Sequence, residues 1–271
     1  MKYLKNVMLL TVSTMFVLLF SNCNNDKDKD TPILEGGKLK LSFAHYYDGK
    51  PCVYDKMIYK NAAGNQIEIY DVRWFLSEIV LYPETGTPFK IQKAQDIFYV
   101  DNTIPSTLNF DLLDIIPPGK YDSLTFTFGI NAAKNIDYLF VNPPEANMSW
   151  PSIYGGGYHY MQIDGFWNDS SFGRRAFNFH IGIGSVITPK DTSFVQNYFT
   201  VSLKDSSFTI IKNKSKEIQI IMNIEEWFKN PNIYDFDFWG PQIMENESAM
   251  AKICQNGRFG VFKVGYIKDI Q

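Results

Sequence analysis

The chain has 271 residues, 26 basic and 29 acidic side chains, a formal net charge of −3 and an aromatic content of 16%. Because the two signs of charge are interspersed, the sequence offers no basic stripe for nucleic acid and no cationic face for anionic lipid. Without its first 30 residues the chain has an ordinary length for one β-domain, so a single large hydrophobic core is expected.

The N-terminus has the pattern of a bacterial export signal. Two lysines within the first five residues precede an apolar run over residues 7–20, which is too short to span a bilayer comfortably. The run ends at Leu19-Phe20-Ser21-Asn22-Cys23, which resembles the lipobox of Bacteroidetes-type lipoproteins. We therefore expect a signal peptide over residues 1–22, lipidation of Cys23, a flexible tether over residues 23–36 and a single domain over residues 37–271.

This N-terminus indicates a protein of the cell envelope, anchored to the outer membrane by its lipid and either periplasmic or surface-exposed. The alternative is an ordinary cleaved signal peptide, which would leave a soluble periplasmic protein. Cys52 and Cys254 then remain, and in an oxidising compartment they could form a disulfide. The alternative for this pair is two buried free thiols, because cysteine also packs as a small apolar side chain.

The dominant hydrophobic period of the chain is two, which is typical of half-buried strands. Turn sequences such as Asp48-Gly49 and Pro117-Pro118-Gly119 separate the candidate strands. Many short strands joined in this way predict an all-β fold, an antiparallel β-sandwich of Greek-key-like type. The candidate strands cover residues 38–43, 53–60, 66–82, 97–101, 123–130, 157–167, 176–183, 196–203, 207–212, 217–223 and 261–267.

Two segments depart from the strand pattern. Residues 225–229 predict a short helical turn that ends at Asn230-Pro231. Residues 243–256 have a broad apolar face and are followed by Gly257, which predicts one amphipathic C-terminal helix packed on the sandwich.

The motifs of several enzyme classes are absent from the sequence. It contains no nucleophile elbow, no phosphate-binding glycine loop, no Cys-x-x-Cys and no His-Glu-x-x-His. We therefore expect a binding protein, with a mononuclear copper redox enzyme as a minor alternative.

The stretch from Met148 to Gly165 concentrates unusual side chains. It contains Met148, Trp150, His159 and Met161 together with a triple glycine. Nitrogen and soft sulfur donors suit copper, whereas magnesium and calcium prefer oxygen ligands. This stretch is therefore the first candidate for a metal site, although Trp150 and the two methionines are also ordinary core-filling side chains.

The chain has three histidines, His45, His159 and His180, and each lies in a strand-like run. Alternation places His45 on the inward face with Leu41 and Phe43, and it places His180 opposite the apolar stripe of its strand. Histidines on rigid strands are good metal ligands when their second nitrogen is fixed by a hydrogen bond. The alternative for each one is a hydrogen-bonded packing residue.

Several separated segments together resemble the MbnP-like family, which is named for a periplasmic copper-associated protein encoded beside methanobactin genes. The matching segments are, in chain order, Phe43-Ala44-His45, Asn61 to Asn65, Val72 to Leu81, Val100-Asp101, Pro118 to Tyr121, Met148-Ser149-Trp150 with Gly157 to Gly165, and Phe179-His180-Ile181-Gly182. They span most of the mature chain in order.

The resemblance implies an all-β extracytoplasmic domain that holds copper. In the best-known relatives histidines bind the ion together with kynurenine, an oxidised tryptophan made by a dihaem peroxidase partner. By position, the resemblance implies His45, His180 and Trp150 as the first ligand set, and His159, Met148 and Met161 could complete a soft Cu(I) site. Either that peroxidase or copper-transport components would be the partners.

The sequence as a whole therefore predicts an extracytoplasmic lipoprotein that binds a metal ion, with copper favoured, for acquisition, storage or delivery. The alternative is a surface adhesion or ligand-binding β-sandwich without metal. In that second case aromatic side chains would grip a sugar or a partner protein, and the candidates are Tyr46, Tyr47, Tyr154 and Tyr158.

Overall fold

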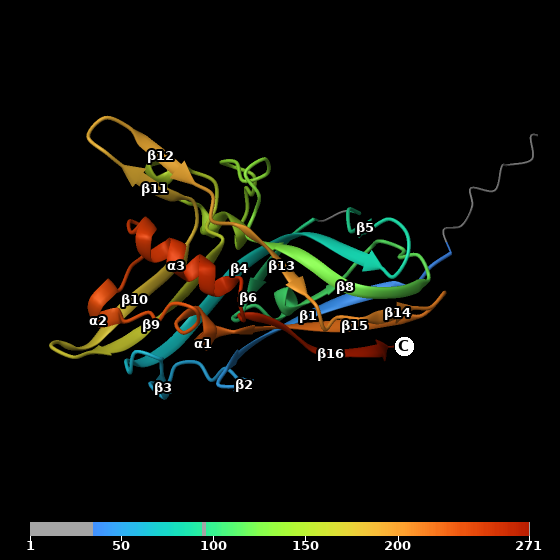
Figure 1. Cartoon of the computed structure of the whole chain (residues 1–271), viewed down its shortest axis with the longest axis horizontal. Coiled ribbons are helices and arrows are strands. Elements are labelled where there is room, and N and C mark those ends of the chain that lie inside the picture. The colour runs from blue at the N-terminus through green and yellow to red at the C-terminus, as the bar shows by residue number, and fades with distance from the viewer. Residues whose placement is uncertain (1–34, 94–95, 271) are drawn as a thin grey trace, which may run out of the picture. The chain divides into compact units, whose positions relative to one another are not determined.

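The computed structural model describes residues 35–93 and 96–270. The expected signal peptide, Cys23 and nearly all of the expected tether lie outside the described residues. Two β-sheets and a separate two-stranded hairpin make up most of the described chain (Figure 1).

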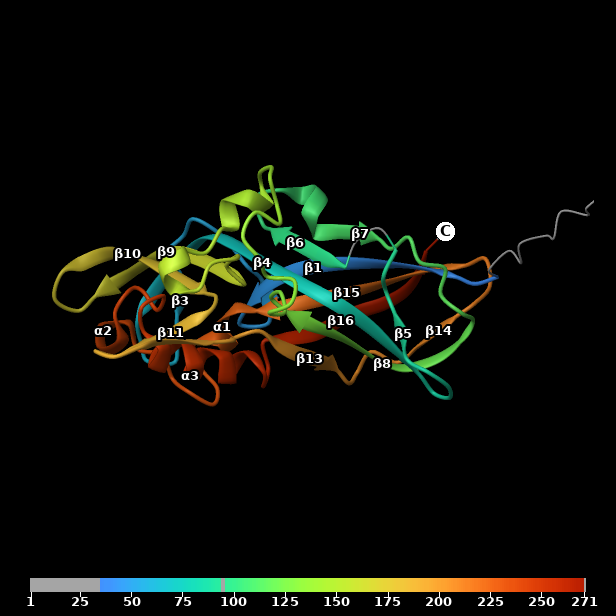
Figure 2. The ribbon, with the colours of Figure 1, turned by 90° about the horizontal axis from the view of Figure 1, so that it is seen from above.

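The smaller sheet has five strands. Its strand order is β16-β15-β1-β2, and β7 adds to β1 at one end. The β1–β15 pair is parallel, and the other pairs in this sheet are antiparallel. Figure 2 shows β1, β15 and β16 running together along the domain. The bounds are β1 (Lys38–Tyr47), β2 (Lys50–Pro51), β7 (Asn109–Asp111), β15 (Ser215–Asn223) and β16 (Phe262–Ile270).

The larger sheet has nine strands and is organised around the long strand β4. The central order is β10-β9-β4-β8-β13, with β3, β5 and β6 on β4 and β14 on β8. The bounds are β3 (Tyr59–Lys60), β4 (Gln66–Pro83), β5 (Phe89–Lys90), β6 (Ile97–Asp101), β8 (Gly119–Phe128), β9 (Met161–Asp169), β10 (Gly173–Ile181), β13 (Phe199–Leu203) and β14 (Phe208–Ile210). The separate hairpin pairs β11 (Gly184–Ile187) with β12 (Thr192–Val195).

Aromatic side chains fill the space between the two sheets. Trp74 of β4 packs edge-on against Phe43 of β1, with ring centroids 5.5 Å apart, and lies 5.2 Å from Phe262 of β16. These side chains come from alternate positions of their strands, as a half-buried strand requires. The predicted all-β sandwich with a short helix is therefore confirmed. Among the strand pairs of the described residues, only β1 with β15 is parallel.

Three short helices pack beside the sheets (Figure 1). They are α1 (Ile224–Trp227), α2 (Phe236–Trp239) and α3 (Glu247–Gly257), with α3 next to β11 and α2 next to β9. The predicted C-terminal helix starts four residues later than expected, because the Asn246 side chain caps it by accepting a hydrogen bond from the Ala249 amide at 3.0 Å. None of the helices in the described part of the chain has the length and apolarity to cross a membrane.

Four further elements differ from the predicted ones. Of the strand expected over residues 53–60 only Tyr59–Lys60 pairs, and the strand expected from residue 157 begins at Met161. The β11–β12 hairpin and α2 were not foreseen, because the first is exposed throughout most of its length and the second is a single turn.

Cys52 and Cys254 are free thiols, so the disulfide considered from the sequence is wrong. Cys52 lies just after β2 and accepts a hydrogen bond from the Tyr59 hydroxyl at 3.7 Å, whereas Cys254 is buried within α3. Burial raises the pKa of both thiols, to about 11 for Cys52 and about 12 for Cys254. Both are therefore protonated near pH 7 and pack as small side chains.

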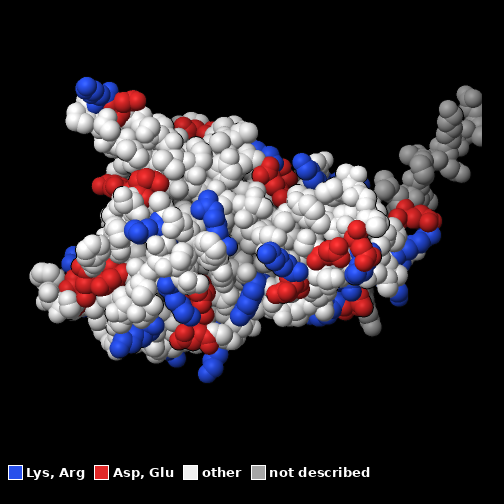
Figure 3. All heavy atoms as spheres, in the orientation of Figure 1, with Lys and Arg blue, Asp and Glu red and all other residues white. Residues whose placement is uncertain are grey.

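Charged side chains are interspersed over the surface in view in Figure 3, with blue and red groups alternating among uncharged ones. This face therefore carries no large area of a single sign, as the composition predicted.

Candidate metal centre

A tight turn brings Trp150 close to His159. The Trp150 amide donates to the Gly157 carbonyl at 2.8 Å, and the His159 amide donates to the Met148 carbonyl at 2.7 Å. The short 3-10 helices Glu145–Met148 and Ser152–Tyr154 flank Trp150 in this turn. His159 therefore lies in an ordered hairpin-like segment just before β9, and not inside the strand itself.

The triple glycine is what allows this turn. Gly155, Gly156 and Gly157 all have positive φ, between 68° and 114°, which side-chain-bearing residues rarely adopt. A Cβ on Gly157 would also lie 2.6 Å from the Asn135 side chain. Since Asn135 in turn accepts a hydrogen bond from the Tyr158 amide at 2.9 Å, the missing side chain lets a neighbouring loop approach and fix the turn.

His159 presents an unused nitrogen lone pair inside the protein. Its Nδ1 lies 2.9 Å from the Met148 carbonyl oxygen. A carbonyl can only accept, so Nδ1 carries the proton and Nε2 carries the lone pair. Nε2 is buried and has no hydrogen-bond partner. Burial lowers the pKa of His159 to about 4, with a further contribution from the nearby His180, so the ring is neutral near pH 7.

His180 has the same arrangement with its two nitrogens exchanged. Its Nε2 lies 2.9 Å from Oδ1 of Asp164 on the neighbouring strand β9. Nε2 therefore donates to the carboxylate, and Nδ1 is buried and has no partner. A neutral imidazole of this tautomer has its lone pair on Nδ1.

Asp164 is itself held in place. Its Oδ1 also accepts from Asn178 Nδ2 at 2.6 Å. Burial alone would raise the pKa of Asp164, but the hydrogen bonds from His180 and Asn178 outweigh burial and lower it. The carboxylate therefore stays charged and fixes both the tautomer and the orientation of His180.

The two rings are neighbours. The centroids of His159 and His180 are 5.0 Å apart and the rings are nearly perpendicular, at 84°. Metal–nitrogen bonds are about 2.0–2.1 Å long, so two rings that share one ion must lie about this close. We refer to these two residues as the histidine pair.

Trp150 lies against the histidine pair. Its ring centroid is 4.7 Å from that of His159 in an edge-on contact, and its Nε1 donates to the Tyr154 carbonyl at 3.1 Å. Gly182, two residues after His180, permits this position, since a Cβ there would lie 2.5 Å from the indole ring. The structure therefore brings together His159, His180 and Trp150.

His45 lies in a different environment. Trp74 Nε1 donates to its Nε2 at 3.0 Å, and its Nδ1 lies 2.9 Å from the Tyr54 hydroxyl. Both nitrogens are therefore hydrogen-bonded, and the inward orientation predicted from alternation is confirmed by its burial. Burial lowers the pKa of His45 to about 4, partly opposed by the charge of Asp101. The structure does not place His45 with the histidine pair.

The two methionines belong to the hydrophobic core. Met148 and Met161 are both fully buried, and Met161 pairs with Ile181 of β10 and Trp74 of β4. Met148 contributes its backbone carbonyl to His159. Among the described residues no group of three or more His, Cys, Asp and Glu side chains is arranged to hold an ion. An ion at the histidine pair would thus need a further ligand of another kind.

The tyrosines considered for gripping a sugar are largely unavailable. Tyr47 and Tyr158 are both only 2% exposed, and Tyr158 donates to the Phe140 carbonyl at 3.1 Å. Tyr154 donates to Glu245 at 2.5 Å. That version of the adhesion alternative is wrong for Tyr47 and Tyr158, because both side chains pack inward.

Sequence reasoning missed the roles of Asp164 and Asn178. Asp164-Gly165 reads as a simple strand end, and Asn178 as a polar position facing away from the apolar stripe. The signal was present in the β9–β10 hairpin, where Asp164 lies opposite Asn178 and diagonal to His180. Correct pairing of these two strands would have placed a carboxylate beside a histidine.

Comparisons with known proteins agree on one family. The MbnP family model matches residues 36–246. The solved structure of MbnP from Methylosinus trichosporium aligns with a TM-score of 0.53 and 13% sequence identity, covering 86% of this chain and 99% of that chain. No curated protein matches the chain. At this identity the structural likeness supports the fold, whereas the family model spans most of the sequence, and the chain therefore belongs to the MbnP family.

Proposed function

We propose that the protein binds a copper ion at His159 and His180. One observation carries this proposal: two adjacent imidazoles each have one buried nitrogen without a hydrogen-bond partner, while their other nitrogens are fixed by a carbonyl and a carboxylate. A buried polar atom without a partner costs free energy, so such an atom calls for an explanation. One cation bound by both neighbouring rings would explain the two atoms together.

Copper is the ion that this environment favours. Imidazole suits copper as well as zinc, nickel and iron. Among the described residues no carboxylate, thiolate or third histidine is arranged with the pair to hold an ion, since Asp164 bonds the Nε2–H of His180. A site of two imidazoles with few further donors is poor for the hard cations, and the copper association of the MbnP family favours copper over zinc. Because burial keeps His159 neutral, a metal ion would meet little competition from protons at neutral pH.

Trp150 is the candidate for the third ligand. The family resemblance implies that a tryptophan in this motif becomes kynurenine, and Trp150 has its ring edge-on to His159. Such a modification would add an amine or a carbonyl donor beside the histidine pair. A dihaem peroxidase would be the partner that makes it, and copper-transport components would be the alternative partners.

The physiological role that follows is acquisition, storage or delivery of copper, with binding and not catalysis as the activity. The lipobox-like sequence at Cys23 supports attachment to the outer membrane, where such a protein would meet copper before it reaches the inner membrane.

A copper titration of the mature protein tests the proposal. Cu(I) and Cu(II) are titrated into the wild type and into His159→Ala, His180→Ala and His45→Gln variants, with circular dichroism to confirm folding. We expect one copper per chain in the wild type and in His45→Gln, and loss of that site in the other two. Retention of the site by both His159→Ala and His180→Ala would overturn the proposal. Intact mass of protein from its native envelope would report modification of Trp150.

A further inference from the structure

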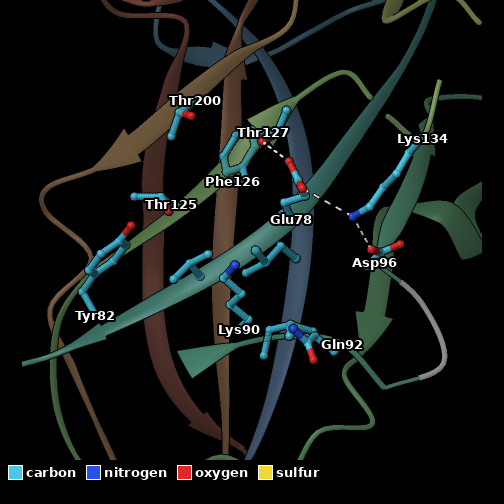
Figure 4. A pocket seen from close by; sticks show the side chains of 13 residues that line it. Glu78, Tyr82, Lys90, Gln92, Asp96, Thr125, Phe126, Thr127, Lys134 and Thr200 are labelled. Carbon is cyan, nitrogen blue, oxygen red and sulfur yellow. Dashed lines mark hydrogen bonds and ion pairs between the residues drawn. The ribbon is translucent and has the colours of Figure 1, made fainter. Parts of the chain in front are cut away.

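A polar cavity lies in a different part of the larger sheet and shares no residue with the metal centre. It has a volume of about 370 Å³ and is bordered by β4, β5, β8 and β13 (Figure 4). Small-ligand sites typically fall between about 300 and 1,000 Å³. Nine of the thirteen lining residues are polar, whereas Ile79, Ile91 and Phe126 are buried and form part of an apolar floor.

The wall of this cavity is built around Glu78, whose backbone is unusual. Glu78 lies within β4 at an irregularity in the pairing with β8, between Ser77 and Val80, and has φ of 53°. A residue with a Cβ adopts positive φ at some cost, and a β-bulge redirects a side chain from its regular position. Strained positions of this kind cluster at binding sites.

The Glu78 carboxylate is held by three donors. Its Oε2 accepts from Thr127 Oγ1 at 3.0 Å, and its Oε1 accepts from Asn131 Nδ2 at 2.6 Å and from Lys134 Nζ at 3.4 Å. Lys134 also bridges to Asp96 Oδ2 at 2.5 Å, as the dashed lines in Figure 4 show. The network joins three separate segments, so this wall is preorganised before any ligand arrives.

The opposite side of the cavity offers polar groups that are not in use. The side chains of Lys90, Thr125 and Thr200 make no hydrogen bond or ion pair with any other residue in the described part of the chain. Tyr82, 38% exposed, adds an aromatic face at one end (Figure 4). The cavity thus has a fixed wall on one side and available donors and acceptors on the other.

The charges of the lining cancel. Lys90 and Lys134 are matched by Glu78 and Asp96, so the cavity has no net charge with which to select an anion or a cation. A ligand that fits must instead both donate and accept hydrogen bonds at several neighbouring positions. Vicinal hydroxyl groups do this, and the carbon-bound hydrogens of a sugar ring pack on an aromatic face.

We propose that this cavity binds a neutral sugar, a monosaccharide or one unit of a disaccharide. The sugar hydroxyls bond to Lys90, Thr125 and Thr200, and its apolar face lies on Tyr82. This binding is independent of the copper site, and the two sites can be tested separately.

Saturation-transfer NMR on the mature protein tests this proposal with a panel of defined sugars: glucose, galactose, mannose, xylose, N-acetylglucosamine, cellobiose and maltose. We expect saturable binding of at least one. Lys90→Ala and Thr200→Val each remove one hydrogen-bonding group from an exposed side chain and should weaken that binding about threefold to tenfold.

Two substitutions elsewhere serve as matched controls, because both side chains are exposed and lie outside the cavity. They are Lys263→Ala on β16 and Thr192→Val on β12, and they should leave sugar binding unchanged. The proposal is overturned if no sugar binds saturably, if the cavity variants bind like the controls, or if glucuronic acid or inorganic phosphate binds more tightly than every neutral sugar.

Discussion

His45 and the histidine pair belong to one β-sandwich, but they differ in whether both ring nitrogens have a hydrogen-bond partner. At His45 the indole N–H of Trp74 donates to Nε2, so the ring is saturated within the core. At His159 and His180 one nitrogen of each ring donates to a fixed acceptor and the other has no partner. Burial and a lowered pKa are common to His45 and His159, so neither property distinguishes a packing histidine from a ligand. The nitrogen without a partner is the property on which the proposed metal site rests.

The largest effect that would sharpen this comparison is on copper affinity. Because the pair would act as a unit, His159→Ala and the double His159→Ala, His180→Ala variant should lose about the same affinity, each more than about 100-fold. Isothermal titration with Cu(II), and competition with a chromophoric chelator for Cu(I), measure this. Additive losses in the two single variants would mean that the rings do not share an ion.

A smaller loss of affinity is expected when the group that orients His180 is changed. Asp164→Asn keeps the size of the side chain but removes the charge that fixes the Nε2 proton, and changes next to a ligand typically cost about 10- to 100-fold in metal affinity. Asn178→Ala, which removes only a donor to Asp164, should cost less. Electron paramagnetic resonance of the Cu(II) form provides a spectroscopic check. If the role of Asp164 were purely structural, the couplings between copper and its nitrogen ligands would be the same in Asp164→Asn as in the wild type.

The same comparison predicts the opposite result at His45. His45→Phe leaves the Trp74 N–H buried without an acceptor, which should lower the free energy of unfolding by about 1–3 kcal/mol. Copper affinity should be unchanged. Urea denaturation followed by circular dichroism measures the first quantity and the titration above measures the second. A stable variant with lost copper binding would reverse the assignment of the three histidines.

The close contact between Gly182 and the Trp150 ring, beside the histidine pair, offers a test of geometry. Gly182→Ala would place a Cβ 2.5 Å from the Trp150 ring, so the indole must shift. We expect a loss of about 1–3 kcal/mol in the free energy of unfolding, as for other overpacked core sites. Urea denaturation measures this loss, and a change in the tryptophan fluorescence spectrum relative to the wild type reports the shift of the indole. Gly173→Ala provides a control with the same substitution at a glycine that has no atom within 4 Å of the added Cβ, although its positive φ adds a backbone cost.

The sequence was sufficient for the fold but only partly for the site. Period-two patterning identified the long strands, and alternation placed His45 inward, because both depend on local backbone geometry. The pattern of strand residues could not show that Nε2 of His45 accepts a hydrogen bond from the Trp74 indole, because Trp74 comes from the other sheet. The proximity of His159 to His180 depends on the turn at Gly155 to Gly157 and on the β9–β10 pairing, so it can be recognised only when the register of these two strands is known.

The last expected effect is a dependence of stability on pH, which is gradual within any one pH unit. The pKa of His45 is about 4 in the folded protein, lowered by burial from its ordinary value of 6.5. The unfolded chain therefore binds more protons between these two values, so the stability contributed by the neutral ring is complete above about pH 6.5 and declines as the pH falls towards 4. One such group changes the free energy of unfolding by at most about 1.4 kcal/mol per pH unit. His159 contributes in the same direction, since burial also lowers its pKa to about 4.

Urea midpoints between pH 7 and 4.5 should therefore fall less steeply in His45→Phe than in the wild type. Saturating copper should reduce the part of this pH dependence that is due to His159, because the ion would occupy the Nε2 lone pair of His159. The part due to His45 should be unchanged. Equal flattening of both shares would place His45 within the metal centre.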